Sequence, residues 1–228
     1  MTSFEPHWEA LPPAQREIWP HLAAGCQLGL VLYGGTAVAL RLGHRSSIDF
    51  DFFTEMPLDR ENIGSRFPIL GLSTIIQDRE NTLTVLAPIA KASVKISFFG
   101  EISTGRVGVP EPTPDGVLEV ASLLDLLATK LKVMQQRVEA KDYRDVAAIL
   151  SAGVELQDGL AAAVALYGVN FQPSEGLKAL AYFEGGDLAS LPTGDKELLT
   201  RAVANVRRIP VTGLASRSLS AQHKPEEK

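Results

Sequence analysis

The feature that most constrains the fold is an alternation of acidic and apolar residues in the stretch IDFDFF, which begins at Ile48. In a β-strand, successive side chains point to opposite faces of the sheet, so Asp49 and Asp51 would share one face. Their Cα atoms would lie about 6.5–7 Å apart. Ile48, Phe50 and Phe52 would point the other way and anchor the strand in the core. The sequence therefore predicts a sheet with an apolar face and an acidic face.

The residues before this strand predict a second strand that leads directly into a helix. Residues 28–33 (LGLVLY) form a short apolar run that ends at Gly34 and Gly35, as in a buried strand. Residues 36–42 (TAVALRL) favour a helix, and Gly43 would end it as a C-cap. Glycines at a strand-to-helix turn let a ligand approach the backbone, and the helix N-terminus offers unpaired N–H groups to a phosphate.

The rest of the chain divides into a β-rich part and a helical part. The β-rich part has a helical region at its start and a Gly- and Pro-rich crossing loop at its end. The predicted helices are residues 5–24, 58–67, 119–140, 143–153, 157–167, 174–183 and 195–208, the further strands are 72–77, 82–86 and 93–99, and the crossing loop is 100–118. This order predicts an α+β fold, a mixed β-sheet flanked by helices and followed by a mostly helical C-terminal half.

Three regions follow from this division. Residues 1–118 form the predicted α/β core with its N-terminal helix, and residues 119–212 form a helical region that packs on the core. Residues 213–228 are small, polar and charged, which predicts a disordered tail.

Composition narrows the classes of partner. The net charge of −5 and the pI of about 5.4 mean that no broad basic surface is expected, which counts against nucleic acid as the main partner without excluding it. A single cysteine excludes an intrachain disulfide. No apolar run approaches the length of a membrane span, and the start of the chain lacks the pattern of a signal peptide. We therefore expect a soluble, cytoplasmic protein with no membrane partner.

The paired aspartates are the strongest chemical signal. Two carboxylates on one face can share hard divalent cations, and a bound Mg²⁺ would neutralise phosphates and help to activate an attacking hydroxyl. If the strand extends backward, Arg45 and Ser47 join that face and contact phosphate oxygens. The alternative is a half-exposed edge strand with two solvated aspartates. A Gly-Gly turn, a short helix and the aspartate pair within 18 residues favour the nucleotide and metal site.

Residues 32–53 resemble the signature of the AbiEii/AbiGii toxin family of nucleotidyltransferases, in the DNA polymerase beta-like superfamily. The family pattern Arg-x-Ser-x-Asp-x-Asp-Phe is matched at Arg45, Ser47, Asp49, Asp51 and Phe52. The resemblance resumes at residues 129–150 (TKLKVMQQRVEAKDYRDVAAIL) and is faint beyond residue 151. It implies a nucleotidyltransferase-like sheet in the first half of the chain.

The resemblance also implies roles for individual residues. Gly34, Gly35 and Thr36 would contact a triphosphate, Asp49 and Asp51 would hold Mg²⁺ or Mn²⁺, and Lys130, Arg137, Asp142 and Asp145 would line the cleft. The implied catalytic residues are Asp49, Asp51, Lys130 and Asp142, and Arg45, Ser47, Lys95, Arg137 and Asp145 complete the nucleotide site. Spacing alone places Lys130 and Arg137 on one helix face, and Asp142 and Asp145 on another, which also suits a solvated, salt-bridged helix pair.

One position departs from the superfamily pattern. A third acid is usual on a later strand, and the matching position in the strand SVKISFF is Ser97, on the same face as Lys95. A serine neither binds Mg²⁺ strongly nor accepts a proton at neutral pH. Either Asp78, Glu80 or Glu101 replaces the missing acid, or a general base is dispensable, or the site is altered.

Three hypotheses about function follow. The first is an enzyme that transfers a nucleoside monophosphate from an NTP to an acceptor, with an antitoxin as a protein partner. RNA, including tRNA, is the leading acceptor class, and the acidic pI leaves a small molecule or a protein side chain open. The second is a relative of the same fold that binds a nucleotide or a protein without turnover. The third, an interaction module without a nucleotide site, requires the glycine and aspartate pairs to be coincidental.

Overall fold

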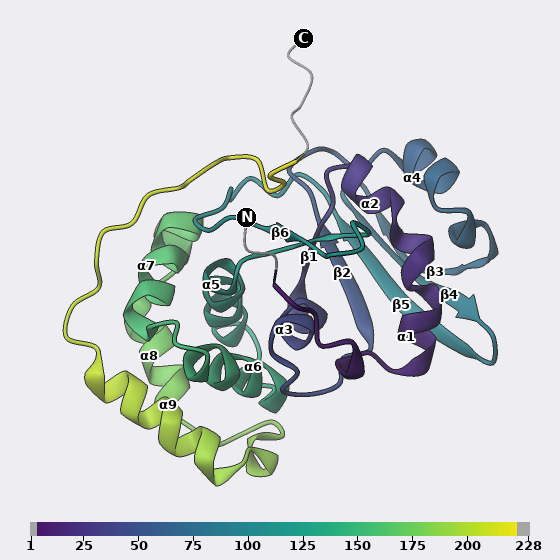
Figure 1. Cartoon of the computed structure of the whole chain (residues 1–228). Helices are drawn as coiled ribbons and strands as arrows, with labels where there is room; N and C mark the ends of the chain where they lie inside the picture. Colours follow the sequence, from purple (N-terminus) through teal and green to yellow (C-terminus); the bar gives the residue numbers. More distant parts are fainter. Residues whose placement is uncertain (1–3, 223–228) are drawn as a thin grey trace.

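The computed structural model describes residues 4–222 of the 228-residue chain. It contains a mixed seven-stranded sheet with helices on both sides, and a group of helices beside the sheet (Figure 1). The strands are β1 (Val31–Tyr33), β2 (Asp49–Phe53), β3 (Thr74–Arg79), β4 (Thr82–Ile89), β5 (Ala92–Phe99), β6 (Glu111–Pro112) and β7 (Glu119–Val120). Their order is β3-β4-β5-β2-β1-β7-β6. The pairs β2–β5 and β1–β7 are parallel, and the other pairs are antiparallel.

The helices fall into two groups along the chain. The first four lie within the β-rich part, and the last five form the helical half (Figure 1). They are α1 (Pro13–Ile18), α2 (Ala24–Gln27), α3 (Gly34–Leu42), α4 (Arg60–Arg66), α5 (Leu123–Met134), α6 (Ala140–Ser151), α7 (Leu156–Tyr167), α8 (Pro173–Ala181) and α9 (Thr193–Asn205), with short 3₁₀ turns at Trp8–Ala10, Trp19–Leu22, Pro68–Leu72, Gly168–Asn170 and Leu188–Ser190. The predicted α+β class is confirmed.

The apolar face of β2 anchors the sheet. Phe50 and Phe52 are fully buried, and their rings lie 6.1 Å from the ring of Trp19 and 5.6 Å from the ring of Phe98, respectively. The predicted core role of these two residues is confirmed. For Ile48 the prediction is wrong, because β2 begins at Asp49 and the alternation does not extend backward; Ile48 is 62% exposed.

The turn between β1 and α3 is tighter than predicted. The helix begins at Gly34, directly after the strand, instead of two residues later. Gly34 has φ +72°, a left-handed conformation that glycine adopts without the steric cost of a Cβ atom. At the other end Gly43 is the left-handed C-cap, and its N–H donates to the Ala39 carbonyl, as predicted.

The start of the helical half differs from its prediction. Residues 119–120 form β7, which pairs with β1, so the sheet extends across the predicted boundary at residue 118. The Ser122 hydroxyl then accepts from the N–H of Asp125 and caps α5. This helix ends at Met134, so the single helix predicted for residues 119–140 is replaced by a strand, a capped helix and a turn into α6.

The C-terminal segment also differs from its prediction. After α9 the chain runs back along the outside of the helical half to the sheet (Figure 1). The N–H of Arg106 donates to the Ser216 carbonyl at 2.9 Å, Leu219 is buried, and the Glu119 carboxylate accepts from Ser220 Oγ and from the N–H of Ala221. These backbone and carboxylate partners hold residues 215–222 on the core, whereas residues 223–228 of the predicted tail lie outside the described residues.

Within residues 4–222, no single helix is long and apolar enough to cross a bilayer. One pair of segments, Ala140–Ser151 and Leu156–Asn170, meets the length and composition together, but the two are bent by 119° at the break between them.

Candidate active site

The acidic face of the sheet forms the floor of a cavity of about 770 Å³, and α5 contributes part of the wall. The strands β2, β4 and β5, the β1–α3 turn and the loop before β2 supply most of the other lining residues. From the sheet and turn these are Gly34, Gly35, Asp49, Asp51, Phe53, Thr84, Lys95, Ser97 and Phe99, and from α5 and the turn after it Leu126, Thr129, Lys130, Val133 and Arg137. The cavity thus combines carboxylates, cations and a helix N-terminus.

Asp49 and Asp51 both face this cavity, as the alternation predicted. Lys95 pairs with Asp49 in the register of β2 and β5, and its Nζ lies 2.6 Å from Asp49 Oδ2. Burial raises the pKa of Asp51, and the nearby Asp49 carboxylate adds to the rise, while Lys95 and a hydrogen bond from Ser97 oppose it. The two carboxylates therefore repel each other in a partly desolvated site that favours a bound cation.

Gly34 and Gly35 have no room for a side chain. A Cβ atom on Gly34 would lie 2.5 Å from Asp51 Oδ2, and one on Gly35 would collide with the Arg45 guanidinium. Both residues line the cavity at the N-terminus of the nine-residue helix α3. The turn therefore presents bare backbone beside the aspartates, as an anion site requires.

Thr36 differs from its implied role as a triphosphate contact. Its side chain is buried, it does not line the cavity, and its hydroxyl lies 2.9 Å from Ser47 Oγ and also reaches the Asp49 carbonyl. Thr36 therefore holds the loop before β2 against α3. Arg45 and Ser47 reach the cavity from this loop, not from an extension of β2.

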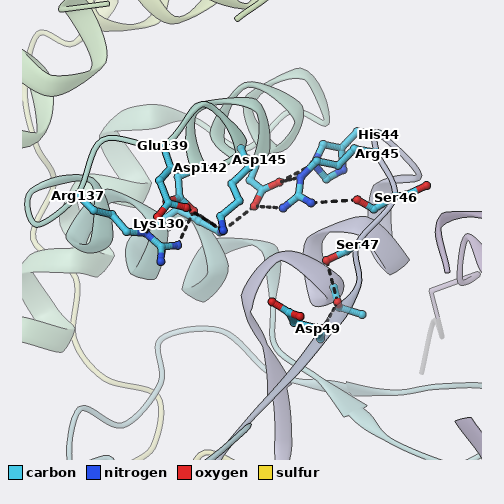
Figure 2. Close-up of polar contacts among 12 residues, drawn as sticks. His44, Arg45, Ser46, Ser47, Asp49, Lys130, Arg137, Glu139, Asp142 and Asp145 are labelled. Carbon is cyan, nitrogen blue, oxygen red and sulfur yellow. Dashed lines mark hydrogen bonds and ion pairs between the residues drawn. The ribbon is translucent and has the colours of Figure 1, made fainter. Parts of the chain in front are cut away.

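A cluster of ion pairs includes three residues that line the cavity, Arg45, Lys130 and Arg137. Figure 2 shows Lys130 between Asp142 and Asp145, and its Nζ lies 2.7 Å from Asp142 Oδ1 and 2.6 Å from Asp145 Oδ2. Arg137 donates from Nε to Asp142 Oδ2 at 2.9 Å. The Arg45 guanidinium donates two hydrogen bonds to the Asp145 carboxylate, from Nε to Oδ1 at 2.6 Å and from Nη2 to Oδ2 at 2.9 Å. The cluster joins α5, α6 and the loop before β2.

Contrary to the prediction, Asp142 and Asp145 do not line the cavity. Both side chains are fully buried, and each is surrounded by cations. Burial alone would raise the pKa of Asp145, but hydrogen bonds from His44 and Arg45 and the charge of Lys130 hold it well below its usual range. Burial would also raise the pKa of Asp142, but the charges and hydrogen bonds of Lys130 and Arg137 outweigh this effect and lower it. Both aspartates are therefore anions at neutral pH that position the lining residues Lys130, Arg137 and Arg45.

Three residues of the site were not predicted from the sequence. The Nε2 of His44, in the loop before β2, lies 2.7 Å from Asp145 Oδ1. Phe53 and Phe99 also line the cavity. The alternation that placed Asp49 and Asp51 on one face also places Phe53 there, so that signal was present in the sequence.

The third acid is missing at the expected position. Ser97 lies opposite Asp51 in the parallel register of β2 and β5, and it lines the cavity. None of its three predicted replacements lines the cavity. Asp78 pairs with Arg60 at 2.7 Å, the carboxylate of Glu101 accepts from Asn81 Nδ2, and Glu80 lies in the exposed turn between β3 and β4. Among the described residues, the cavity therefore has two carboxylates of its own, Asp49 and Asp51.

This donor set fits Mg²⁺ bound together with a nucleotide. Within residues 4–222, no group of three or more His, Cys, Asp or Glu side chains forms a metal cage of protein ligands alone. Mg²⁺ is commonly held by one or two carboxylates together with waters and substrate phosphates. Asp49 and Asp51 supply such a pair next to a predicted phosphate site, and Lys95 now occupies one of the Asp49 oxygens.

The chain matches a protein-family model. The model described as nucleotidyl transferase AbiEii toxin, type IV TA system, matches residues 20–205. The matched segment covers most of the chain and includes every residue of the cavity and of the ion-pair cluster.

The chain is also similar to individual proteins, in sequence and in structure. An uncharacterized protein of Aquifex aeolicus is 34% identical over 117 residues, which are 50% of this chain and 54% of that protein, so the match spans about half of the relative. The nucleotidyltransferase toxin MenT4 from Mycobacterium tuberculosis superposes with a TM-score of 0.51 at 14% identity, over 82% of this chain and 88% of MenT4. An antigenic nucleotidyltransferase-like protein from Paracoccidioides brasiliensis gives a TM-score of 0.50 at 15% identity, over 87% of this chain and 95% of that protein. These two structures share the nucleotidyltransferase fold.

Proposed function

The chain belongs to the AbiEii nucleotidyl transferase toxin family, and we propose that it transfers a nucleoside monophosphate from an NTP to an acceptor hydroxyl. The observation that carries this proposal is the meeting of Asp49, Asp51 and the Gly34–Gly35 turn in one cavity with Lys95, Lys130 and Arg137. In the proposed reaction, the acceptor oxygen forms a bond to the α-phosphorus and the α–β anhydride bond breaks. Pyrophosphate leaves, and the hydroxyl proton passes to solvent.

The phosphates of the NTP are proposed to lie at the glycine end of the cavity. Gly34 and Gly35 line the cavity, and the N-terminus of α3 carries a partial positive charge. Arg45 lines the same region while its fork is held by Asp145. A guanidinium that is already fixed loses little side-chain entropy when it contacts a phosphate.

Asp49 and Asp51 are the proposed ligands of Mg²⁺ or Mn²⁺. A bound divalent ion would neutralise the phosphates and help to activate the acceptor hydroxyl. Lys95 must release Asp49 Oδ2 for the ion to use that oxygen, and its ammonium is then free to contact a phosphate. Lys130 and Arg137 stabilise the charge of the leaving pyrophosphate from the helical side, and the buried carboxylates of Asp142 and Asp145 position these groups.

RNA, including tRNA, is the leading acceptor class, and an antitoxin is the proposed protein partner. Both parts of the proposal rest on the family, whose description names a toxin of a toxin–antitoxin system. The cations that line the cavity suit a phosphate-bearing acceptor, although the chain as a whole is acidic. Because NTPs and RNA are found together in the cytoplasm, the proposal places the protein there.

The test is transfer of label from α-³²P-labelled NTPs to total RNA in the presence of Mg²⁺ or Mn²⁺. We expect labelled RNA with the natural chain and a loss of at least a hundredfold in Asp49→Asn and Asp51→Asn, which keep the side-chain shape and remove the charge. Glu197→Gln is the matched control, because Glu197 is an exposed carboxylate on α9 outside the cavity. Label transfer that persists in both aspartate variants would contradict the assignment of the site.

A second candidate is favoured by one observation, the serine at the position of the third acid. With Ser97 beside Asp51, and with Asp78, Glu80 and Glu101 outside the cavity, no further carboxylate among the described residues is placed to take the acceptor proton. The chain would then bind a nucleotide, or a protein partner, without turnover. NTP binding without label transfer to any RNA, protein or small-molecule acceptor supports this candidate, and Ser97→Asp is then expected to increase transfer.

A further inference from the structure

The cavity floor changes in character along two neighbouring strands. In the parallel register of β2 and β5, three cross-strand pairs face the cavity in succession: Asp49 with Lys95, Asp51 with Ser97, and Phe53 with Phe99. The first pair is an ion pair, the second is a carboxylate beside a hydroxyl, and the third is aromatic. The floor is therefore charged at one end and aromatic at the other.

Core packing does not account for the exposure of the aromatic end. The neighbouring residues Phe52 and Phe98 point to the opposite face and are fully buried. Phe53 and Phe99 are only half-buried, and their rings lie 5.3 Å apart in an edge-to-face arrangement. A third ring, that of the buried Tyr33, stacks on Phe53 at 4.7 Å with an interplanar angle of 12°. Phe53 is thus braced from within, while both phenylalanines remain open to the cavity.

The spacing of the two ends suits a nucleotide. Phe53 is two residues beyond Asp51 on the same face, so their Cα atoms are about 6.5–7 Å apart. In a nucleotide, one ribose separates the α-phosphate from the base. When the α-phosphate lies at Asp49 and Asp51 and the other phosphates lie toward Gly34 and Gly35, the base is directed away from the charged end.

We propose that Phe53 and Phe99 form the binding site for the nucleobase of the substrate NTP. The inference rests on the proposed function and adds the place and the chemistry of base recognition. Every base has a flat, polarisable face, and stacking on an aromatic side chain is tolerant of base identity. Leu126 of α5 also lines the cavity and adds apolar surface.

The test compares ligands with and without a base. The affinities of α,β-methylene ATP, α,β-methylene CTP and inorganic tripolyphosphate are measured by calorimetry in Mg²⁺ buffer. Phe99→Ala is expected to weaken both nucleotide analogues roughly tenfold or more and to leave tripolyphosphate unchanged. Phe99→Tyr keeps the ring and should bind like the natural chain. Phe183→Ala is the matched control, since Phe183 is a half-buried phenylalanine that packs on Tyr143 away from the cavity.

Each other outcome overturns the inference. If Phe99→Ala binds both nucleotide analogues with unchanged affinity, Phe99 does not bind the base, and the proposed function still stands. If Phe99→Ala weakens tripolyphosphate as much as the analogues, the ring affects binding by supporting the fold and not by contacting the base. A raised KM for the RNA acceptor with unchanged analogue affinity assigns the aromatic end to the acceptor instead. If the natural chain binds neither analogue nor tripolyphosphate, the proposed function fails as well. Should Phe99→Ala not fold, Phe99→Leu keeps apolar volume, removes the ring, and is expected to weaken the analogues alone.

Discussion

At the scale of single residues, Lys130 has the largest predicted effect on stability. Its ammonium is the shared partner of the fully buried Asp142 and Asp145 carboxylates. Lys130→Met keeps the volume and leaves both anions short of a partner, so the free energy of unfolding should fall by about 3–5 kcal/mol. Urea denaturation measures this. Lys178→Met, which removes an exposed ion pair with Glu175, should cost less than about 1 kcal/mol, and an equally small loss for Lys130→Met would contradict the prediction.

The same cluster predicts how stability depends on pH. The pKa of Asp145 in the folded chain lies below its unfolded value, so its contribution is fully present above the usual aspartate range and is lost as the pH falls through about 3.9 and below. Asp51 acts in the opposite sense, because its pKa is raised in the folded chain. We expect the free energy of unfolding to fall more steeply between pH 5 and pH 3 in the natural chain than in Asp145→Asn.

Urea denaturation at a series of pH values checks that slope, and Asp195→Asn serves as the control on α9. NMR titration of the Asp145 carboxyl carbon gives an independent measurement. A carboxyl carbon that titrates at or above about 3.9 would contradict the assignment.

The sequence predicted the orientation of the aspartates that face the cavity better than that of the aspartates that are buried beside it. Alternation along one strand is a local property, so Asp49 and Asp51 could be placed on one face without knowledge of the fold. Helical spacing placed Asp142 and Asp145 together but could not tell a solvated face from a buried one. Asp145 is buried against His44 and Arg45, about a hundred positions away along the chain. The position of the Thr36 side chain was hidden for the same reason, since its partners lie in the loop before β2 and at the start of that strand.

At the scale of secondary-structure elements, the β1–α3 turn depends on Gly34. Gly34→Ala would require a left-handed conformation, which costs about 1–2 kcal/mol for a residue with a Cβ atom, and would crowd Asp51. We expect a loss of that size in the free energy of unfolding and weaker binding of tripolyphosphate. Gly194→Ala on α9 is the control, because its Cβ would meet no atom within 4 Å; it should be neutral or stabilising by up to about 1 kcal/mol. Equal behaviour of the two variants would show that the turn is not strained.

Elements with a strong local pattern were predicted, and elements defined by their partners were not. The alternation of residues 49–53 and the left-handed Gly43 cap are both present in the structure. The short strand β7 was missed because two residues carry no periodicity and become a strand only by pairing with β1. A signal for the start of α5 was present in Ser122 and Asp125, which have the spacing of a helix-capping pair.

At the scale of the whole molecule, the C-terminal segment (residues 215–222) packs on the core and contributes a buried side chain to it. Leu219 is 1% exposed, and its N–H donates to the Glu55 carboxylate at 3.0 Å. Leu219→Ala should therefore lower the free energy of unfolding by about 2–5 kcal/mol, as for other buried leucines. Val211→Ala is the control, since Val211 is fully exposed and its truncation should change stability by less than about 0.5 kcal/mol. Thermal unfolding compares the two variants, and equal melting temperatures would contradict this role.

Composition could not predict this segment, because small polar residues usually indicate a flexible tail. The segment is ordered because it donates hydrogen bonds to two carboxylates that are distant along the chain, those of Glu55 and Glu119. The order of the strands was equally hidden, since pairing a strand with its third neighbour along the chain leaves no local pattern. The fold class was predictable from the succession of elements, whereas the contacts that join the two halves depend on the three-dimensional structure.

The alternation in β2 has a consequence for how such a chain can diverge. Phe50 and Phe52 belong to the core, and Asp49, Asp51 and Phe53 belong to the cavity, with no spacer between the two sets. A one-residue insertion or deletion would exchange the two faces, burying carboxylates and exposing aromatic rings. We therefore expect homologous chains to vary in this strand by point substitution alone, and to accommodate gaps in the flanking loops.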